Sequence, residues 1–86
     1  MEKSIYSQEY SRFLELLRDA RENKGLTQTE VAQRLGQTQS FVSKVERGER
    51  RLDIVELRAF CSALGLSLLK FVEEIERVLG RASRQK

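Results

Sequence analysis

The stretch from Thr27 to Gly48 reads TQTEVAQRLGQTQSFVSKVERG, and this stretch decides the fold. Its apolar residues recur three or four positions apart in two short runs on either side of Gly36, which predicts two helices joined by a tight turn. The inward side carries Val31, Leu35, Val42 and Val45, with Ala32 where the two helices meet. The outward side of the second helix carries amides, hydroxyls and cations: Gln39, Ser40, Ser43, Lys44 and Arg47. Such a face suits base edges and phosphates, so the stretch predicts DNA binding.

The composition of the chain limits its size class and its chemistry. Its 86 residues suffice for a single domain, which we expect to span 1–86. No apolar run is long enough to cross a membrane, and the first residues lack the pattern of a secretory signal. Cys61 is the only cysteine and histidine is absent, which argues against disulfides, most zinc sites and histidine-based catalysis. We therefore expect a cytoplasmic protein that is not an enzyme and needs no metal or cofactor.

Charge is distributed unevenly along the chain, whose formal net charge is +3. Residues 25–52 carry five basic and three acidic side chains, net +2, whereas residues 53–80 carry three and five, net −2. The segment 81–86 adds three basic side chains and is expected to form a flexible tail. Positive charge thus lies in the segment predicted to face DNA phosphates, although ordinary surface variation would explain an excess of this size equally well.

Glycines and N-cap residues mark the ends of the predicted helices. Glycine follows each segment of helical periodicity, at positions 25, 36, 48, 65 and 80. The predicted N-caps are Thr27, Thr38, Asp53 and Ser67. Strand patterns are absent, so the predicted fold class is all-α. The five predicted helices span residues 7–23, 28–35, 39–47, 54–64 and 67–79.

Residues 12–69 resemble the helix-turn-helix domain of the lambda-type phage repressor and Cro family, also called the xenobiotic-response-element (XRE) family. The matching motifs are RENKGLTQTEVAQRLG from Arg21 to Gly36, TQSFVSKVERG from Thr38 to Gly48, and ALGLS at 63–67. The resemblance implies a compact five-helix repressor-like domain with its helix-turn-helix at 28–47. It also implies that the helix at 39–47 lies in the major groove, with the helix at 28–35 crossing above it.

The resemblance assigns roles to individual residues. It implies base contacts from Thr38, Gln39, Ser40, Ser43 and Lys44. It implies phosphate contacts from Gln28, Arg47, Arg50 and Arg51. Gln39 is the strongest candidate for a base contact, because an amide can donate and accept together against adenine. For Thr38 an N-cap is an equal alternative, and Lys44 suits guanine and phosphate equally.

Two further expectations concern residues away from the polar face. In relatives, an arginine late in the first helix pairs with a glutamate late in the recognition helix, which implies an orienting ion pair between Arg21 and Glu46. The helix at 67–79 carries a wide apolar arc, which favours a homodimer interface, although a monomer with a broad apolar stripe is an alternative. The predicted interface residues are Leu68, Phe71, Val72, Ile75, Val78 and Leu79.

The sequence therefore predicts a sequence-specific transcription regulator that binds a double-stranded, palindromic DNA operator as a homodimer and represses transcription. A restriction–modification controller or the antitoxin of a toxin–antitoxin pair would share this fold. An alternative from a different class is a protein-interaction module that uses the apolar face of the helix at 67–79.

Overall fold

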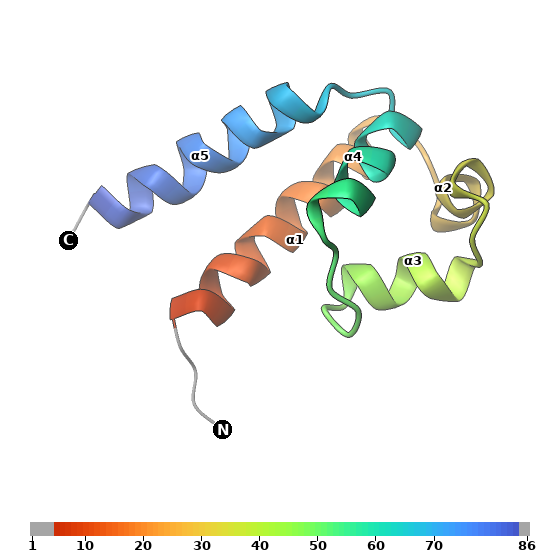
Figure 1. Cartoon of the computed structure of the whole chain (residues 1–86), viewed down its shortest axis with the longest axis horizontal. Coiled ribbons are helices and arrows are strands. Elements are labelled where there is room, and N and C mark those ends of the chain that lie inside the picture. The colour runs from red at the N-terminus through yellow and green to blue at the C-terminus, as the bar shows by residue number, and fades with distance from the viewer. Residues whose placement is uncertain (1–4, 85–86) are drawn as a thin grey trace.

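The computed structural model describes the backbone of residues 5–84 and the side chains of residues 8–80. It contains five helices and, within residues 5–84, no strand. In chain order the helices are α1 (Ile5–Asn23), α2 (Gln28–Leu35), α3 (Gln39–Glu46), α4 (Ile54–Ala63) and α5 (Leu68–Arg84) (Figure 1). The predicted all-α, five-helix architecture is confirmed.

Side chains fix the starts of α2 and α4 at the residues that the sequence marks. The Thr27 hydroxyl accepts the Glu30 N–H, and the Glu30 carboxylate accepts the Thr27 N–H, which completes a capping box. Asp53 and Glu56 form the same reciprocal pair at the start of α4. Each pair satisfies two backbone donors that a first helical turn would otherwise leave without a partner.

Two glycines show why helix ends are only partly predictable. Gly36 ends α2 in the left-handed conformation, with φ at 70°, and the Gln37 N–H donates to the Ala32 carbonyl at 2.9 Å. Gly80, by contrast, lies inside α5, which continues to Arg84, so the predicted helix end at residue 79 is wrong. A single glycine weakens a helix by only about 1 kcal/mol, and the neighbours on both sides favour helix. The side chains of the predicted tail, 81–86, lie outside the described residues.

The hydrophobic core lies where α1 to α4 meet, with the first turns of α5 against it. α2 packs on α3 and α4, while α1 contacts both α3 and α5. The buried apolar residues are Leu17, Val31, Ala32, Val42, Val45, Leu57, Phe60, Cys61, Ala63, Leu64 and Phe71. Because α3 buries its apolar side in this core, its polar side is left to face outward.

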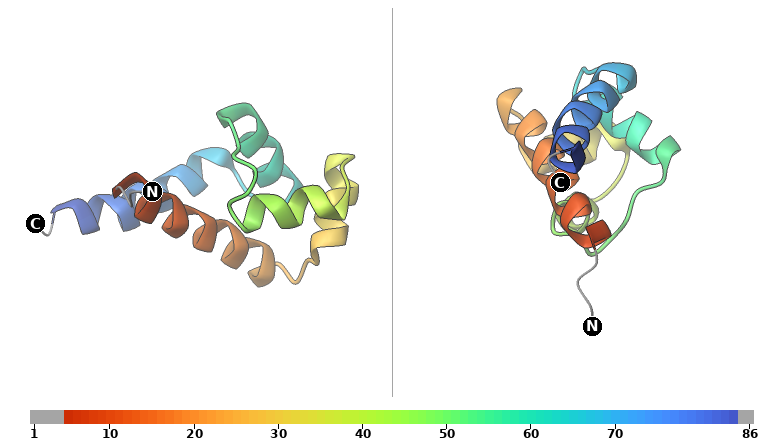
Figure 2. Two further views of the ribbon diagram at one scale, coloured as in Figure 1. Left: turned by 90° about the horizontal axis from the view of Figure 1, so that it is seen from below. Right: turned by 90° about the vertical axis from the view of Figure 1, so that its left-hand side faces the viewer.

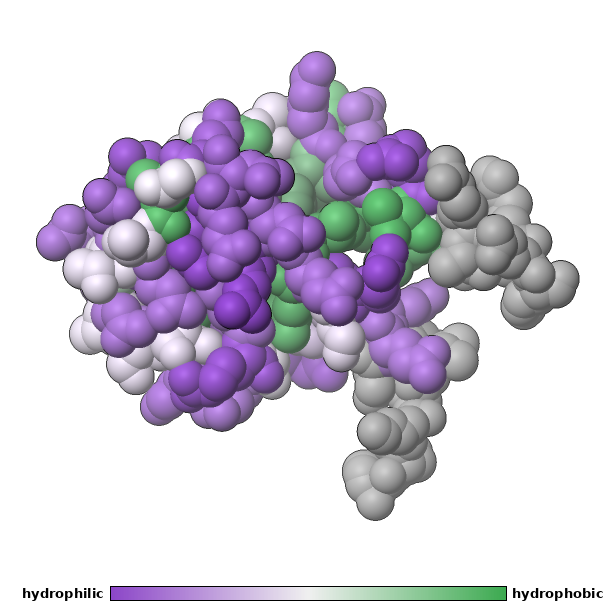
Figure 3. Space-filling model, turned by 180° about the vertical axis from the view of Figure 1, so that it is seen from behind, coloured by the Kyte–Doolittle hydropathy of each residue, from purple (hydrophilic) through white to green (hydrophobic). Residues whose placement is uncertain are grey.

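α1 and α5 lie antiparallel and extend to the same side of the molecule, away from the α2–α3 pair, as the views in Figures 1 and 2 show. The Cα radius of gyration is 13.2 Å, whereas a compact chain of this length is expected at about 12 Å. Seen from behind, hydrophobic surface gathers in the hollow between the two helices (Figure 3). These two helices therefore form an arm that the rest of the fold does not cover.

The apolar face of α5 is divided between this hollow and the core. Phe71 is only 5% exposed, and its ring packs edge-on against Phe13 of α1 with centroids 6.2 Å apart. Leu68 and Ile75 also pack against the core, whereas Val72 remains 39% exposed. The prediction that Phe71 lies in a dimer interface is therefore wrong, because α1 already covers this side chain.

No helix within residues 5–84 combines the length and the apolar character needed to cross a membrane.

Candidate DNA-binding surface

The polar side of α3 is the outer wall of the helix-turn-helix. Val42 and Val45 are fully buried under the helix, which fixes the direction of its opposite side. Gln39 and Ser43 form one row at i and i+4, and Ser40 and Lys44 form a second row. Within these rows only Ser43 is half-buried, and the other three side chains are exposed. The structure thus gathers four of the five predicted base-contacting residues on one helical face.

Thr38, the fifth of these residues, is the N-cap of α3. Its hydroxyl oxygen accepts the backbone N–H of Phe41 at 3.1 Å. The cap therefore uses one lone pair of the oxygen and leaves the hydroxyl proton and the second lone pair for another partner. Phe41 itself is half-buried and packs near Phe60, as expected for a residue on the edge of the core.

A nearly buried ion pair connects α1 to the end of α3. Arg21 donates from Nε to Glu46 Oε2 at 2.6 Å and from Nη2 to Glu46 Oε1 at 3.0 Å. Only 10% of the Arg21 side chain and 4% of the Glu46 side chain are exposed. The hydrogen bond to Glu46 raises the pKa of Arg21 above its ordinary value, so this guanidinium stays charged. Arg21 also donates to the Leu26 carbonyl at 2.7 Å, which ties the α1–α2 loop to the same pair.

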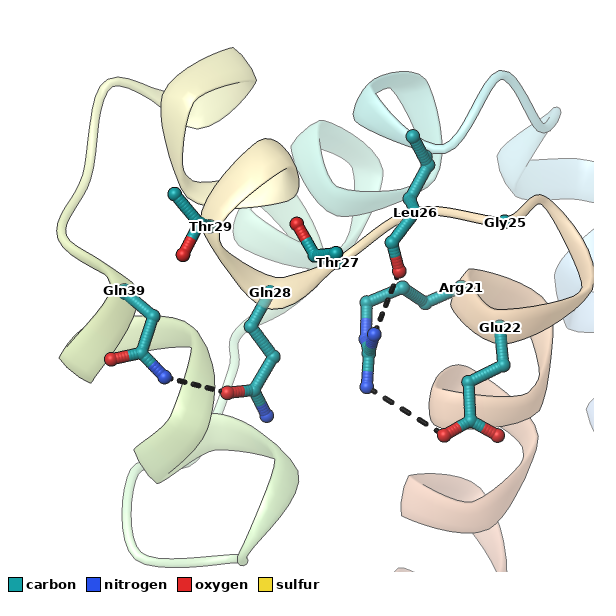
Figure 4. A pocket seen from close by; sticks show the side chains of 8 residues that line it. All are labelled: Arg21, Glu22, Gly25, Leu26, Thr27, Gln28, Thr29 and Gln39. Atoms are coloured by element: carbon teal, nitrogen blue, oxygen red, sulfur yellow. Dashed lines mark hydrogen bonds and ion pairs between the residues drawn. The ribbon is translucent and has the colours of Figure 1, made fainter.

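The ion pair continues into a chain of glutamines that reaches the surface. Gln28 Nε2 donates to Glu46 Oε1 at 2.9 Å, and Gln39 Nε2 donates to Gln28 Oε1 at 2.7 Å. Figure 4 shows the side chains of Gln28 and Gln39 pointing toward each other from the first turns of α2 and α3. One hydrogen-bonded chain therefore joins α1, α2 and α3.

A shallow cavity of about 530 Å³ opens beside this chain at the N-terminus of α2. Its wall includes Thr29, a residue that the sequence did not single out, beside Gln28 and Gln39. The first turn of α2 has amide N–H groups without intrahelical acceptors, and the helix dipole adds partial positive charge there. The helix end in this cavity favours an anion, although Glu22 also lines it, and the signal in the sequence was the position of Thr29 two residues after the cap.

The three arginines predicted to contact phosphate each have a partner within the protein. Arg47 pairs with Glu49 (Nε–Oε2, 3.0 Å) and donates to the Ser43 hydroxyl. Arg50 pairs with Glu56 (Nη2–Oε2, 2.7 Å). Arg51 lies over the Tyr10 ring of α1, with its guanidinium carbon 4.2 Å from the ring centroid. These three guanidinium groups thus lie near the end of α3, and each is held against another group of the protein instead of extending into solvent. The sequence contains these partner residues but does not show which arginine each one contacts, because the conformation of the loop at 47–53 decides the pairing.

The comparison with protein families adds a finding from outside the structure. A family model described as "Helix-turn-helix" matches residues 17–71, more than half of the chain. The chain belongs to the helix-turn-helix family. The match covers the whole segment from the middle of α1 to the first turn of α5, so it includes α2, α3 and the ion pair.

Two relatives place the helix-turn-helix protein within the XRE branch. A solved structure, an XRE-family like protein from Pseudomonas syringae pv. tomato, is 43% identical and superposes with a TM-score of 0.81. The match covers 86% of this chain and 90% of that one. An uncharacterised HTH-type transcriptional regulator, y4dJ of Sinorhizobium fredii, is 42% identical over 52 residues, which are 60% of this chain and 68% of that protein. The predicted membership of the Cro and XRE family is confirmed, and the protein is a DNA-binding transcription regulator.

Proposed function

We propose that the helix-turn-helix protein is a cytoplasmic repressor that binds a palindromic operator as a homodimer, with α3 in the major groove. The observation that carries this proposal is the outer face of α3. It is exposed and free of acids, and it is fixed to the core by the buried valines beneath it. A side chain that is held in place discriminates between bases better than one that first has to be ordered.

The proposed base contacts come from the two rows on α3. Gln39 contacts adenine, Lys44 contacts guanine or a nearby phosphate, and Ser40 and Ser43 contribute hydroxyls. Thr38 contributes a hydroxyl that also caps the helix. Support for this arrangement comes from the shared face and from the exposure of Gln39, Ser40 and Lys44.

The proposed phosphate contacts lie on either side of α3. On one side are Gln28 and the free amides at the start of α2, where helix termini favour anions. On the other side are Arg47, Arg50 and Arg51. For these arginines to bind phosphate, at least Arg47 and Arg50 must exchange a carboxylate partner for a phosphate oxygen. Exposed ion pairs of this kind are weak, so the exchange costs little free energy.

The proposed dimer uses the open apolar surface of α5, within the arm of α1 and α5. Without Phe71, which is buried against α1, the proposed interface consists of Val72, Val78 and Leu79, with the edges of Leu68 and Ile75. Along α5, Lys70 precedes the acidic residues 73, 74 and 76, and the basic residues 77, 81 and 84 follow them. A two-fold axis perpendicular to α5 would pair the two helices antiparallel, and the acidic part of one α5 would then lie opposite the basic part of the other. A dimer of this kind places its recognition helices about 34 Å apart on successive turns of the groove.

Selection of bound sequences from a random pool of DNA duplexes tests the proposal. We expect a palindrome with two half-sites, and we expect Gln39→Ala to lose the preference at one position in each half-site. Glu15→Ala, on the exposed side of α1, serves as the matched control and should select the wild-type sequence. Failure to enrich any sequence would refute operator binding and favour the protein-interaction alternative.

A further inference from the structure

We infer that Glu46 determines which base Gln39 selects, because its carboxylate fixes the orientation of two glutamine amides in series. The inference rests on the proposed function and assigns to Glu46 a positioning role beyond holding the angle of α3. The observation behind it is the chain from Arg21 through Glu46 and Gln28 to Gln39, with hydrogen bonds of 2.6, 2.9 and 2.7 Å.

The first step is the orientation of Gln28. An ionised carboxylate only accepts hydrogen bonds, whereas a glutamine side chain has one accepting and one donating end. Both Glu46 oxygens accept N–H groups of Arg21, and only 4% of the Glu46 side chain is exposed. Gln28 must therefore turn its NH2 group toward Glu46, since the opposite orientation would set two acceptors against each other. Its carbonyl oxygen is then directed toward Gln39.

The second step is the orientation of Gln39. Facing a carbonyl oxygen, Gln39 has to donate one N–H inward, at 2.7 Å from Gln28 Oε1. Its own carbonyl oxygen and its second N–H remain for a base. An acceptor beside a donor matches adenine, which offers the N6 amino group and the N7 acceptor in the major groove.

The reversed orientation predicts a different base. With its carbonyl turned inward, Gln39 would present two N–H groups and no acceptor. Two donors match guanine, which offers O6 and N7 as acceptors. The buried carboxylate therefore sets a preference for adenine over guanine at a position that Glu46 itself does not reach.

Replacement of the carboxylate by an amide tests the inference on DNA. Glu46→Gln can either donate or accept toward Gln28, so both orientations of the chain become available. We expect the wild type to prefer adenine over guanine about ten-fold or more at the position that Gln39→Ala identifies. In Glu46→Gln this ratio should fall toward one. An unchanged ratio in a folded Glu46→Gln protein would overturn the inference.

Two further variants separate the effect from loss of stability. Gln28→Leu breaks the chain and leaves the ion pair of Arg21 and Glu46 in place, so the base ratio should fall as it does in Glu46→Gln. If Gln28→Leu lowers affinity for all sequences equally and keeps the ratio, the inference is wrong. Leu57→Ala creates a cavity in the core beneath α4 without altering any residue of the hydrogen-bonded chain from Arg21 to Gln39. It should keep the wild-type base ratio.

A measurement on the free protein distinguishes failure of the inference from failure of the proposed function. Scalar coupling across hydrogen bonds, measured by NMR, should link the Gln39 side-chain nitrogen to the Gln28 side-chain carbonyl carbon. In Glu46→Gln the reverse coupling, from the Gln28 nitrogen to the Gln39 carbonyl, should appear as well. Reverse coupling alone in the wild type, or none, would overturn the inference. Correct coupling in a protein that selects no DNA sequence would instead refute the proposed operator binding.

Discussion

At the scale of single residues, the pair of Arg21 and Glu46 shows how a charge inside a small core is compensated. Both side chains are almost removed from water, and the carboxylate accepts three hydrogen bonds, two of them from Arg21 and one from Gln28. A buried pair of this kind adds little to stability compared with apolar residues of equal size, but loss of one partner leaves a charge without compensation. The expected consequence is a large effect of single substitutions and a small effect of paired ones.

We predict that Arg21→Leu lowers the free energy of unfolding by about 3–5 kcal/mol, because it strands the Glu46 carboxylate. Arg18→Leu is the control, since Arg18 forms an exposed pair with Glu22 at 3.5 Å on the same helix and should cost less than about 1 kcal/mol. Thermal unfolding followed by circular dichroism measures both. Restoration of most of the lost stability in Arg21→Met/Glu46→Leu would support this explanation, and equal losses in Arg21→Leu and Arg18→Leu would contradict it.

A second prediction at this scale concerns the acid that holds Arg47. The hydrogen bond from Arg47 lowers the pKa of Glu49, so this carboxylate is ionised at neutral pH and competes with phosphate for the guanidinium. We expect Glu49→Gln to tighten binding to all DNA sequences and to steepen the salt dependence by about one phosphate contact. Glu15→Gln removes a comparable exposed acid, paired with Arg12, from α1 and should change neither quantity. Fluorescence anisotropy at several salt concentrations decides between these outcomes.

At the scale of elements, the starts of α2, α3 and α4 were predictable from sequence, whereas α1 and α5 begin at Ile5 and Leu68 instead of residues 7 and 67, and the contacts of the loops were not predictable. Capping boxes are local, so Thr27 with Glu30 and Asp53 with Glu56 mark their helices without any knowledge of the fold. The partner of Arg50 depends on the path of residues 47–53, and no local pattern in the sequence fixes this path. The ion pair of Arg21 and Glu46, 25 positions apart, was expected only through the resemblance to relatives.

The start of α4 gives a prediction on pH. The pKa of Glu56 is lowered from 4.5 by the hydrogen bond from Arg50 and then by the backbone N–H of Asp53. The folded state thus binds this proton less readily than the unfolded state, so the stabilisation is present above pH 4.5 and is lost as pH falls through the lowered pKa.

We therefore expect Glu56→Gln to reduce the fall in melting temperature between about pH 5 and about pH 2, a range that brackets the pKa values of carboxyl groups. Glu15→Gln, at an exposed position on α1, should leave the wild-type pH profile unchanged. Parallel curves for wild type and Glu56→Gln across this range would show that Glu56 does not contribute to the acid sensitivity.

At the scale of the whole molecule, the arm of α1 and α5 is the feature on which the proposed dimer depends. Hydrophobic surface lies open in the hollow between these helices (Figure 3), and Val72 remains 39% exposed. The apolar arc of α5 was visible in the sequence, but its division into a buried and an open part depends on Phe13 of α1. The sequence therefore located the apolar arc on α5 and overestimated the part of it that is open.

We predict that Val72→Glu shifts the protein from dimer to monomer in sedimentation equilibrium, because a charge would be buried between two copies of α5. Operator affinity should fall by about ten-fold or more as the second recognition helix is lost. Leu69→Glu is the matched control, since Leu69 is 68% exposed and lines a different groove, with Arg58 and Ser62 of α4. A wild-type protein that remains monomeric at high micromolar concentration, with and without DNA, would refute the proposed dimer.

The double contact of α1, with α3 at one end of the molecule and α5 along its side, has a mechanical consequence. Its 19 residues correspond to a rod of about 28 Å, which is stiff on the scale of one turn of DNA. In the proposed dimer this rod transmits the position of the symmetry axis to the groove-facing helix. A change in the length of the spacer between operator half-sites should therefore be tolerated poorly. A single added base pair would force either the DNA to untwist or one subunit to dissociate from its half-site.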